Sequence, residues 1–291
     1  MRYQDCYEIG WKRLAEVGIE EAALDARLLL EQICGTNRNT LLVHGDREVS
    51  AQEQQAYEEA IARRSQRIPL QQITGSQEFM GLSFRVNEHV LVPRQDTEIL
   101  VEEALRELQD GMKVLDLCTG SGCILISLLH YSNRCQGVGT DISREALKVA
   151  RQNGAALLGA EKEYIFLESD LFDRVEGRYD IIVSNPPYIR KQEIDTLMPE
   201  VREHEPRLAL DGGGDGLDFY RRIIAESPSY LCGGGRLYLE IGCDQGDAVQ
   251  GLLLQRGFRE INVVQDYAGL DRVAYGYWPS MRSPERPEAD H

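Results

Sequence analysis

The 291-residue chain is short of basic residues and has no long apolar run. Its 32 Lys and Arg face 48 Asp and Glu, so the net charge is −16 and phosphate backbones repel the chain as a whole. No segment approaches the roughly 18 apolar residues of a membrane-spanning helix, and the first residues contain acids and no apolar stretch suited to secretion. We therefore expect a cytoplasmic protein that binds neither membranes nor, directly, nucleic acid.

The sequence also lacks closely spaced pairs of cysteines. The chain has 7 cysteines, an odd number, and no Cys-x-x-Cys spacing among them. This usage is typical of reduced thiols in a cytosolic protein, and we expect no metal site. The length fits one large or two modest domains.

Residues 1–72 carry mostly helical signals, and we expect them to form a small helical domain. One set of apolar residues has the spacing of a single helix face: Leu24, Leu28, Leu29 and Ile33. A second helix is predicted to begin at Ser50, because Ser50 and Glu53 have the spacing of a capping box. Tyr57 and Ile61 then share one side of that helix.

The pattern of apolar residues and glycines changes twice after residue 72. Residues 73–94 mix apolar residues with glycines, which predicts a linking β-hairpin. Residues 95–280 alternate short β-type runs with helical stretches, which predicts an α/β domain with a mostly parallel, doubly wound sheet. Two β runs near the end indicate an antiparallel hairpin at one side of this sheet, and residues 281–291 are expected to be a frayed tail.

A glycine turn follows the first β run of this domain, in Asp116-Leu-Cys-Thr-Gly-Ser-Gly. Gly120 and Gly122 let the backbone approach a ligand, and the next helix offers free N–H groups there. The third glycine of a dinucleotide fingerprint is replaced by Leu125, which argues against close pyrophosphate binding. Asp116 ends the strand as an acid facing the turn, which suits a ligand with an amino group.

Two further acids end the next β runs. Asp141 lies about 20 residues beyond the glycines, where an acid can accept hydrogen bonds from both hydroxyls of a ribose. A helix-capping role is less suited to it, because Ser143 is better placed to cap the following helix. Asp170 ends the third run and can accept from an adenine amino group or be an ordinary surface acid.

The motif that decides the chemistry is Asn185-Pro186-Pro187-Tyr188, directly after a β run. Pro186 forces Asn185 into an extended conformation, and the two prolines fix the amide side chain and the Pro186 carbonyl as two acceptors. They suit a planar NH2 group, against which Tyr188 can lie. Such a nitrogen is a poor nucleophile that positioning can activate without a strong base, and the motif has no histidine nearby.

These two motifs resemble those of amino-group methyltransferases that use S-adenosylmethionine. Further segments are similar to the HemK/PrmC family of peptide chain release factor glutamine methyltransferases: Pro69 to Gly75, Phe79 to Gly81, Val92 to Glu98, Glu205 to Leu210 and Gly214 to Leu217. The resemblance covers nearly the whole chain and is weakest over residues 1–60.

The resemblance implies a seven-stranded, Rossmann-like methyltransferase sheet and a helical domain that helps to grip the release factor. The implied reaction is methylation of the amide nitrogen (N5) of the glutamine in the Gly-Gly-Gln loop of bacterial class-1 release factors. The enzyme is expected to be a monomer.

The residues that the resemblance assigns fall into two sets. The expected cofactor contacts are Asp116, Cys118, Thr119, Gly120, Ser121, Gly122, Asp141, Asp170, Leu171 and Asn185. The expected catalytic and substrate contacts are Asn185, Pro186, Pro187 and Tyr188, joined by Arg94, Thr97 and Glu98. Thr97 and Glu98 are equally well read as a helix cap and first turn. Leu171 replaces a frequent Trp, so aromatic packing on the adenine would need Phe172.

Three other functions compete with this hypothesis. An adenine-N6 methyltransferase of RNA or DNA would use the same motif, but it needs a flipped base and a basic track that the sequence lacks. A nicotinamide oxidoreductase lacks the third glycine and a proton-relay motif. A non-catalytic cofactor-binding protein would have no use for Asn185 and both prolines.

Overall fold

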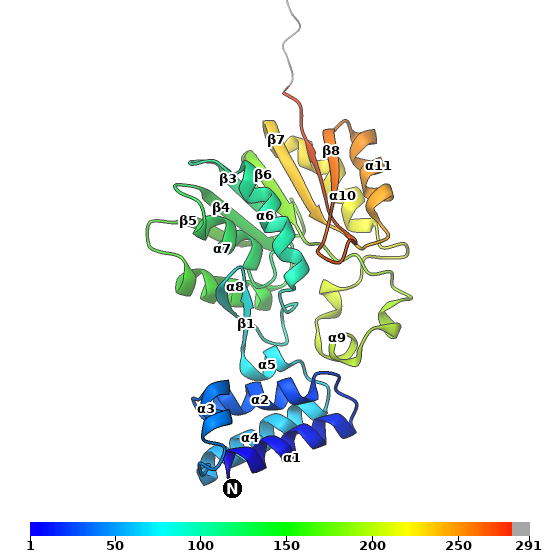
Figure 1. The fold of residues 1–291 in the computed structure, drawn as a ribbon. Helices are drawn as coiled ribbons and strands as arrows, with labels where there is room; N and C mark the ends of the chain where they lie inside the picture. Colours follow the sequence, from blue (N-terminus) through cyan, green and yellow to red (C-terminus); the bar gives the residue numbers. More distant parts are fainter. Residues whose placement is uncertain (281–291) are drawn as a thin grey trace, which may run out of the picture. The chain divides into compact units, whose positions relative to one another are not determined.

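The computed structural model describes residues 1–280 and divides them into two compact units (Figure 1). The first unit contains Met1–Gln77, Val86–Glu88 and Thr196–Glu205, and the second contains Glu78–Arg85, His89–Asp195 and the described chain from Pro206 onward. The predicted frayed tail, residues 281–291, lies outside the described residues. Within residues 1–280, no helix has both the length and the apolar character to cross a membrane.

The first unit is helical. Its helices are α1 (Tyr3–Glu16), α2 (Ala22–Ile33), α3 (Arg38–Val43), α4 (Ala51–Ser65), α5 (Leu70–Thr74) and α9 (Pro199–His204). The predicted capping box is confirmed, because the Ser50 hydroxyl accepts from the Glu53 N–H at 3.2 Å and the Glu53 carboxylate accepts from the Ser50 N–H at 2.8 Å. Tyr57 and Ile61 are both buried, as expected.

The predicted inward face of α2 is partly wrong. Leu29 is buried, but Leu24 is 38% exposed, and the buried stripe runs instead through Ala22, Ala26 and Leu30. The physical reason is an ion pair: Asp25 turns inward with this stripe and accepts from Arg64 Nε at 2.7 Å. Apolar spacing alone does not reveal a buried acid whose partner lies on another helix.

A buried charge network joins α9 to the bundle although the two are far apart in the sequence. Arg64 Nη2 and Arg67 Nη1 each lie 3.0 Å from Glu200 Oε1, and Arg64 also pairs with Asp25. Removing one member of such a network leaves a buried charge unpaired, which is strongly destabilising. The sequence indicated no part for residues 196–205 in the helical unit.

The second unit is built on a seven-stranded sheet with the order β5-β4-β3-β6-β7-β9-β8. Its strands are β3 (Lys113–Leu117), β4 (Gln136–Asp141), β5 (Glu163–Glu168), β6 (Tyr179–Ser184), β7 (Leu231–Glu240), β8 (Arg259–Gln265) and β9 (Asp271–Tyr277). Strands β3 to β7 pair in parallel, and β9 pairs antiparallel with both β7 and β8. The predicted fold class, including the antiparallel hairpin at one side, is confirmed.

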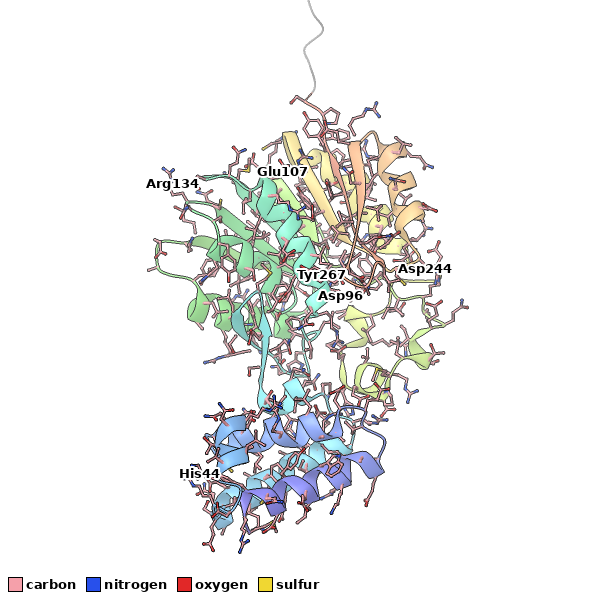
Figure 2. The ribbon with its side chains drawn as sticks, in the orientation of Figure 1. His44, Asp96, Glu107, Arg134, Asp244 and Tyr267 are labelled. Carbon is pink, nitrogen blue, oxygen red and sulfur yellow. The ribbon has the colours of Figure 1, made fainter. Side chains whose placement is uncertain are left out.

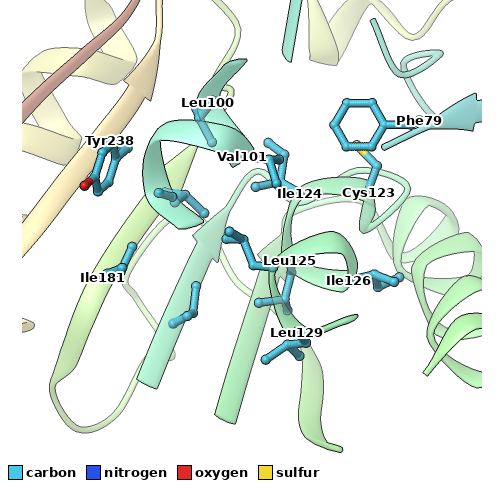
Figure 3. Close-up of a cluster of buried hydrophobic side chains, with 14 of the residues drawn as sticks. Phe79, Leu100, Val101, Cys123, Ile124, Leu125, Ile126, Leu129, Ile181 and Tyr238 are labelled. Carbon is cyan, nitrogen blue, oxygen red and sulfur yellow. The ribbon is translucent and has the colours of Figure 1, made fainter. Parts of the chain in front are cut away.

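Helices cover both faces of this sheet. They are α6 (Glu98–Glu107), α7 (Cys123–His130), α8 (Arg144–Leu157), α10 (Asp218–Glu226) and α11 (Gly246–Arg256), with short 3-10 turns η1 (Gln95–Thr97), η2 (Ile194–Thr196), η3 (Arg207–Ala209) and η4 (Ser227–Ser229). Alternation along the strands separates two cores: Val114 packs with α6, α7 and α8, whereas Leu115 packs with α10 and α11. Figure 3 shows the first core, with Leu100 and Val101 of α6 and Leu125 of α7.

The linking hairpin is shorter than the sequence predicted. Strands β1 (Ser76–Phe79) and β2 (Leu82–Arg85) form a two-stranded sheet, and Phe79 and Phe84 join the first core of the larger sheet. Val90 and Leu91 were expected in strands but lie in a loop, and Ile73 ends up in α5. Both errors come from reading apolar residues beside glycines as strands, when these residues serve a pocket wall and a helix instead.

Candidate active site at the carboxyl edge of the sheet

The sheet register brings the predicted motifs to one edge. Leu117 at the end of β3 lies opposite Thr140 of β4 and Ser184 of β6, so the loops that follow these strands emerge side by side. The strand order reverses at β3, and in such sheets ligands bind outside the carboxyl ends of the strands at this switch point. A pocket with about 1160 Å³ of empty space, partly open to solvent, occupies this edge.

Most of the predicted site residues line this pocket. Those on its wall are Arg94, Thr97, Cys118, Thr119, Gly120, Ser121, Asp141, Asp170, Leu171, Asn185 and Pro187. Five others are not part of the lining: Glu98, Asp116, Gly122, Pro186 and Tyr188. Contacts of four of these five, Glu98, Asp116, Gly122 and Tyr188, are described below.

The glycine turn has a backbone that other residues would strain. Gly120 has φ +55° and Gly122 φ +81°, in the left-handed region. A Cβ on Gly120 would meet nothing within 4 Å, so the turn leaves open space in front of its backbone. A Cβ on Gly122 would lie 2.9 Å from Ile126 Cδ1, so this glycine lets the turn pack tightly against α7.

Asp141 is fixed by two backbone donors. One carboxylate oxygen accepts from the Gly120 N–H at 2.9 Å and the other from the Ser143 N–H at 2.8 Å. Burial raises the pKa of Asp141, and these two hydrogen bonds oppose the rise. Each oxygen has a second lone-pair site, so the carboxylate can still accept from a ligand. Ser143 caps α8 through the Ala146 N–H, as the sequence predicted.

Asp116 lies behind the wall. It is fully buried, and one of its oxygens accepts from the Thr119 hydroxyl at 2.5 Å. The other oxygen has no hydrogen-bond partner among the described residues. Burial raises the pKa of Asp116 to about 7, although the Thr119 hydrogen bond lowers it. The contact that the structure gives Asp116 is therefore with Thr119, which itself lines the pocket.

The loop after β5 places Leu171, rather than Phe172, at the pocket. Leu171 has φ +50° and lines the wall, whereas Phe172 is buried in the second core and stacks on Tyr230 at 4.6 Å between ring centroids. Phe172 therefore does not take the place of the missing Trp. Asp170 is on the wall, and its carboxylate lies 3.0 Å from Arg222 Nη2.

The Asn-Pro-Pro-Tyr segment is held from several sides. Asn185 Nδ2 donates to Thr97 Oγ1 at 3.4 Å, and the Tyr188 hydroxyl donates to Glu240 Oε1 at 3.4 Å. Gln245 Nε2 donates to the Tyr188 carbonyl at 3.0 Å. Gly212 approaches so closely that a Cβ there would lie 2.7 Å from the Tyr188 Cα. The amide of Asn185 thus stands on a braced backbone at the pocket wall.

Thr97 does not act as a helix cap. It precedes α6, but its side chain makes no capping hydrogen bond and is turned toward Asn185. Glu98 lies in the first turn of α6 and accepts from the Met80 N–H at 2.6 Å. Thr97 thus occupies the N-cap position of the helix-start alternative without its side-chain hydrogen bond, and Glu98 lies in the first turn as that alternative had it.

Several wall residues were not found from the sequence. They are His89, Val90, Leu91, Pro93, Cys123, Ile124, Ile142, Ser143, Ala146, Ser169, Pro206, Leu208, Ala209, Phe219 and Arg222. His89 corrects the expectation that no histidine is near the site. Pro206, Leu208 and Ala209 stand in a segment that carried the family resemblance, and this was the only signal for them. Among the described residues, no group of three or more His, Cys, Asp or Glu is arranged to hold a metal ion.

Comparisons with known proteins agree over most of the chain. Residues 7–75 match the family described as PrmC N-terminal domain, and residues 95–215 match the methyltransferase small domain. A release factor glutamine methyltransferase of Geobacter sulfurreducens is 45% identical over 271 residues, which are 92% of this chain and 94% of the relative. The chain belongs to the family of release factor glutamine methyltransferases.

Solved structures support the fold of this family member. A crystal structure of a Pyrococcus furiosus methyltransferase, 17% identical, covers 80% of this chain and all of its own length with a TM-score of 0.53. The T. thermophilus 16S rRNA N2 G1207 methyltransferase, solved with AdoMet and guanosine, is also 17% identical. It covers 71% of this chain and 56% of its own, with a TM-score of 0.50. At these identities the likeness shows the fold alone.

As a member of this family, the chain is a methyltransferase that uses S-adenosylmethionine. The pocket fits this cofactor on two observations. The open space in front of Gly120 admits a ligand close to the backbone, and Asp141 keeps lone pairs that can accept from donors of a ligand while its own position is fixed. Leu171 and Ile142 add apolar surface beside these polar groups. An open backbone turn, a carboxylate acceptor and apolar surface side by side are compatible with the nucleoside part of the cofactor.

Proposed function

We propose that this enzyme methylates the side-chain amide nitrogen (N5) of the glutamine in the Gly-Gly-Gln loop of bacterial class-1 peptide chain release factors. The observation that carries the proposal is the placement of Asn185. Its amide stands on the same pocket wall as Gly120 and Asp141, on a backbone braced by Gln245 and Gly212.

The proposed reaction requires the protein mainly to position the glutamine amide relative to the cofactor. When bound, S-adenosylmethionine supplies an electrophilic methyl group on a sulfonium. Asn185 Oδ1 and the Pro186 carbonyl oxygen would accept the two hydrogens of the glutamine NH2 and so would orient its nitrogen toward the bound cofactor. Holding reactants in this way can supply about 7–11 kcal/mol of a barrier. Fixed acceptors also stabilise the positive charge that develops on the nitrogen.

The cofactor roles follow from the same wall. Gly120, Ser121 and Thr119 form the turn that approaches the cofactor, with Asp116 holding Thr119 and Gly122 allowing the turn to pack. Asp141 accepts from the ribose hydroxyls, and Asp170, Leu171 and Cys118 complete the wall around the adenosine. Arg94 and Thr97 belong to the side of the pocket that receives the substrate, and Glu98 supports them through its position in α6.

The helical unit is proposed to recognise the release factor, with residues 1–72 as a recognition domain, 73–94 as a linker and 95–280 as the catalytic domain. Two exposed apolar side chains of α3 support this role, since Leu42 is 74% and Val43 72% exposed. We expect Leu42→Asp to raise the KM for release factor severalfold without changing the Kd for S-adenosylmethionine. An unchanged KM would show that Leu42 of α3 does not take part in recognition of the release factor.

One experiment separates this function from its nearest rival. The enzyme is incubated with methyl-labelled S-adenosylmethionine and, in parallel, with a purified class-1 release factor or with ribosomal RNA. Label is expected on the release factor alone, and mass spectrometry should place it on the glutamine of the Gly-Gly-Gln loop. A release factor with that glutamine replaced by alanine is the matched control. Label on the RNA instead would establish an adenine methyltransferase.

We further propose that the enzyme acts as a monomer in the cytoplasm and without direct nucleic-acid contact. The net charge of −16 supports the last point, because it disfavours approach to RNA. Size-exclusion chromatography with light scattering tests the monomer, for which a mass near 32.9 kDa is expected.

A further inference from the structure

Glu240 is a buried acid beside the site that the proposed mechanism does not use. It ends β7 and is 2% exposed. The Tyr188 hydroxyl donates to its Oε1 at 3.4 Å, and the Thr97 hydroxyl forms a hydrogen bond that lowers its pKa. Its Oε2 has no hydrogen-bond partner among residues 1–280. A buried carboxylate is costly unless hydrogen bonds and opposite charges compensate it.

The two residues that contact this acid also hold the Asn-Pro-Pro-Tyr segment. Thr97 is 2% exposed and accepts from Asn185 Nδ2 at 3.4 Å, while Tyr188 belongs to the segment itself. Glu240 therefore connects to Asn185 through one intervening hydroxyl group. The hydrogen bonds that join Glu240, Thr97 and Asn185 do not involve the residues of the glycine turn.

A threonine hydroxyl has one proton and two lone pairs. If the proton is donated to the Glu240 carboxylate, Thr97 can offer only lone pairs to Asn185. The Asn185 amide must then turn its NH2 group toward Thr97 and its oxygen away from it. Side-chain amides can rotate by half a turn with little change of shape, so a hydrogen-bond network of this kind decides which end faces a ligand.

We propose that Glu240 and Thr97 are positioning residues that fix the Asn185 amide, so that Oδ1 rather than Nδ2 is presented to the NH2 group of the substrate. The inference rests on the proposed function. An acceptor must face that NH2 group, because an NH2 of Asn185 in the same place would repel it. Neither residue touches the reacting atoms.

The state of Glu240 sets the direction of this chain of hydrogen bonds. Burial raises the pKa of Glu240 to about 7, and Thr97 and then Arg272 lower it. The ionisable groups around it are Arg272 of β9, Asp96 of η1, Tyr188, Tyr220 of α10, whose hydroxyl donates to the Glu240 carbonyl, and Cys123 of α7. Arg272 is itself neutralised by Asp266 at 3.0 Å and by Asp96 at 3.4 Å (Asp96 is labelled in Figure 2).

Protonation of Glu240 would release Thr97 from its role as donor. A neutral carboxyl group can donate to Thr97, whose own proton is then free to point at Asn185 Oδ1 and to hold the amide the wrong way round. The ionised form is therefore the active one, and kcat should rise with pH through about 7. Burial also raises the pKa of Asp116 to about 7, so ionisation of Asp116 is the alternative cause of a rise in kcat over this pH range.

The first test changes the hydroxyl group. Thr97→Val keeps the shape of the side chain and removes the hydroxyl, so kcat on release factor should fall about tenfold or more, because small misplacements of a positioning group can cost about 100-fold. The Kd for S-adenosylmethionine should stay within about twofold of wild type, because Thr97 is assigned to the substrate side of the pocket. Thr97→Ser retains the hydroxyl and should restore the rate. The matched control is Thr140→Val, since Thr140 is equally buried and its hydroxyl has no hydrogen-bond partner among the described residues.

The second test changes the acid. Glu240→Gln cannot titrate, so the rise of kcat through about pH 7 should disappear. Glu103→Gln, a buried acid of α6 paired with Arg106, should keep it. If the kcat of Glu240→Gln still rises through about pH 7, that rise belongs to Asp116 or another group, and the inference is overturned. So does a Thr97→Val enzyme with the kcat of wild type, or a Thr97→Ser enzyme that is not rescued.

A third measurement needs no substrate and so separates this inference from the proposed function. The side-chain amide of Asn185 is followed by 15N NMR, with its signals assigned by their loss in Asn185→Asp. In wild type they should shift with a midpoint near pH 7, and in Thr97→Val this titration should vanish. If the titration is present but no release factor is methylated, the proposed substrate is wrong, and the role of Glu240 and Thr97 in orienting the Asn185 amide is supported. If methylation occurs but the titration is absent in wild type, that role is wrong.

Discussion

Replacement of Asp141 gives the most direct test of the cofactor site. The carboxylate accepts from the N–H groups of Gly120 and Ser143, and its remaining lone pairs face the pocket. Asp141→Ala removes the proposed ribose acceptor and also releases the Gly120 turn. A hydrogen bond to a charged group is worth about 1.5–3 kcal/mol, so the Kd for S-adenosylmethionine should rise by about 10- to 150-fold.

Calorimetric titration of the cofactor measures this change directly. Asp180→Ala is a matched control, because Asp180 also accepts a backbone N–H, that of Lys113 at 2.8 Å, but at the amino end of β3, outside the pocket. Its Kd should equal that of wild type. If Asp141→Ala binds the cofactor as tightly as wild type while melting at a lower temperature, the residue only supports the turn and the ribose assignment is refuted.

Three further predictions concern single side chains. Asn185→Ala should lower kcat by about 100-fold or more, as for loss of a preorganised polar group, with cofactor affinity unchanged by calorimetry; near-normal methylation would contradict the amide clamp. Ser50→Ala removes the cap of α4 and should cost about 1 kcal/mol in urea unfolding, and no measurable loss would mean that Glu53 alone suffices. Gly122→Ala combines φ +81° with a 2.9 Å contact to Ile126, so it should destabilise by about 1–3 kcal/mol, and an unchanged melting temperature would show that the turn can relax.

Local signals predicted the second unit well because its elements are defined by short-range chemistry. The glycine turn, the acid at the end of β4 and the double proline each constrain the backbone within a few residues, and parallel strands then bring their carboxyl ends to one edge. Asp141, Gly120 and Asn185 therefore meet as the sequence suggested. The parts that failed depend on partners far along the chain, such as Asp25 on α2, which turns inward because Arg64 on α4 is there to receive it.

Glu240 shows the same limit at the site itself. Its sequence context, an acid ending the apolar run Leu237-Tyr-Leu-Glu, has the form that singled out Asp116 in β3. The sequence does not reveal that β7 lies directly beside β6, with Leu239 opposite Ser184. That neighbour relation brings the end of β7 next to Asn185 and its braced loop. An acid at the end of a buried strand therefore gains a role only from the strand order, and the role of Glu240 toward Asn185 is decided by adjacency in the sheet.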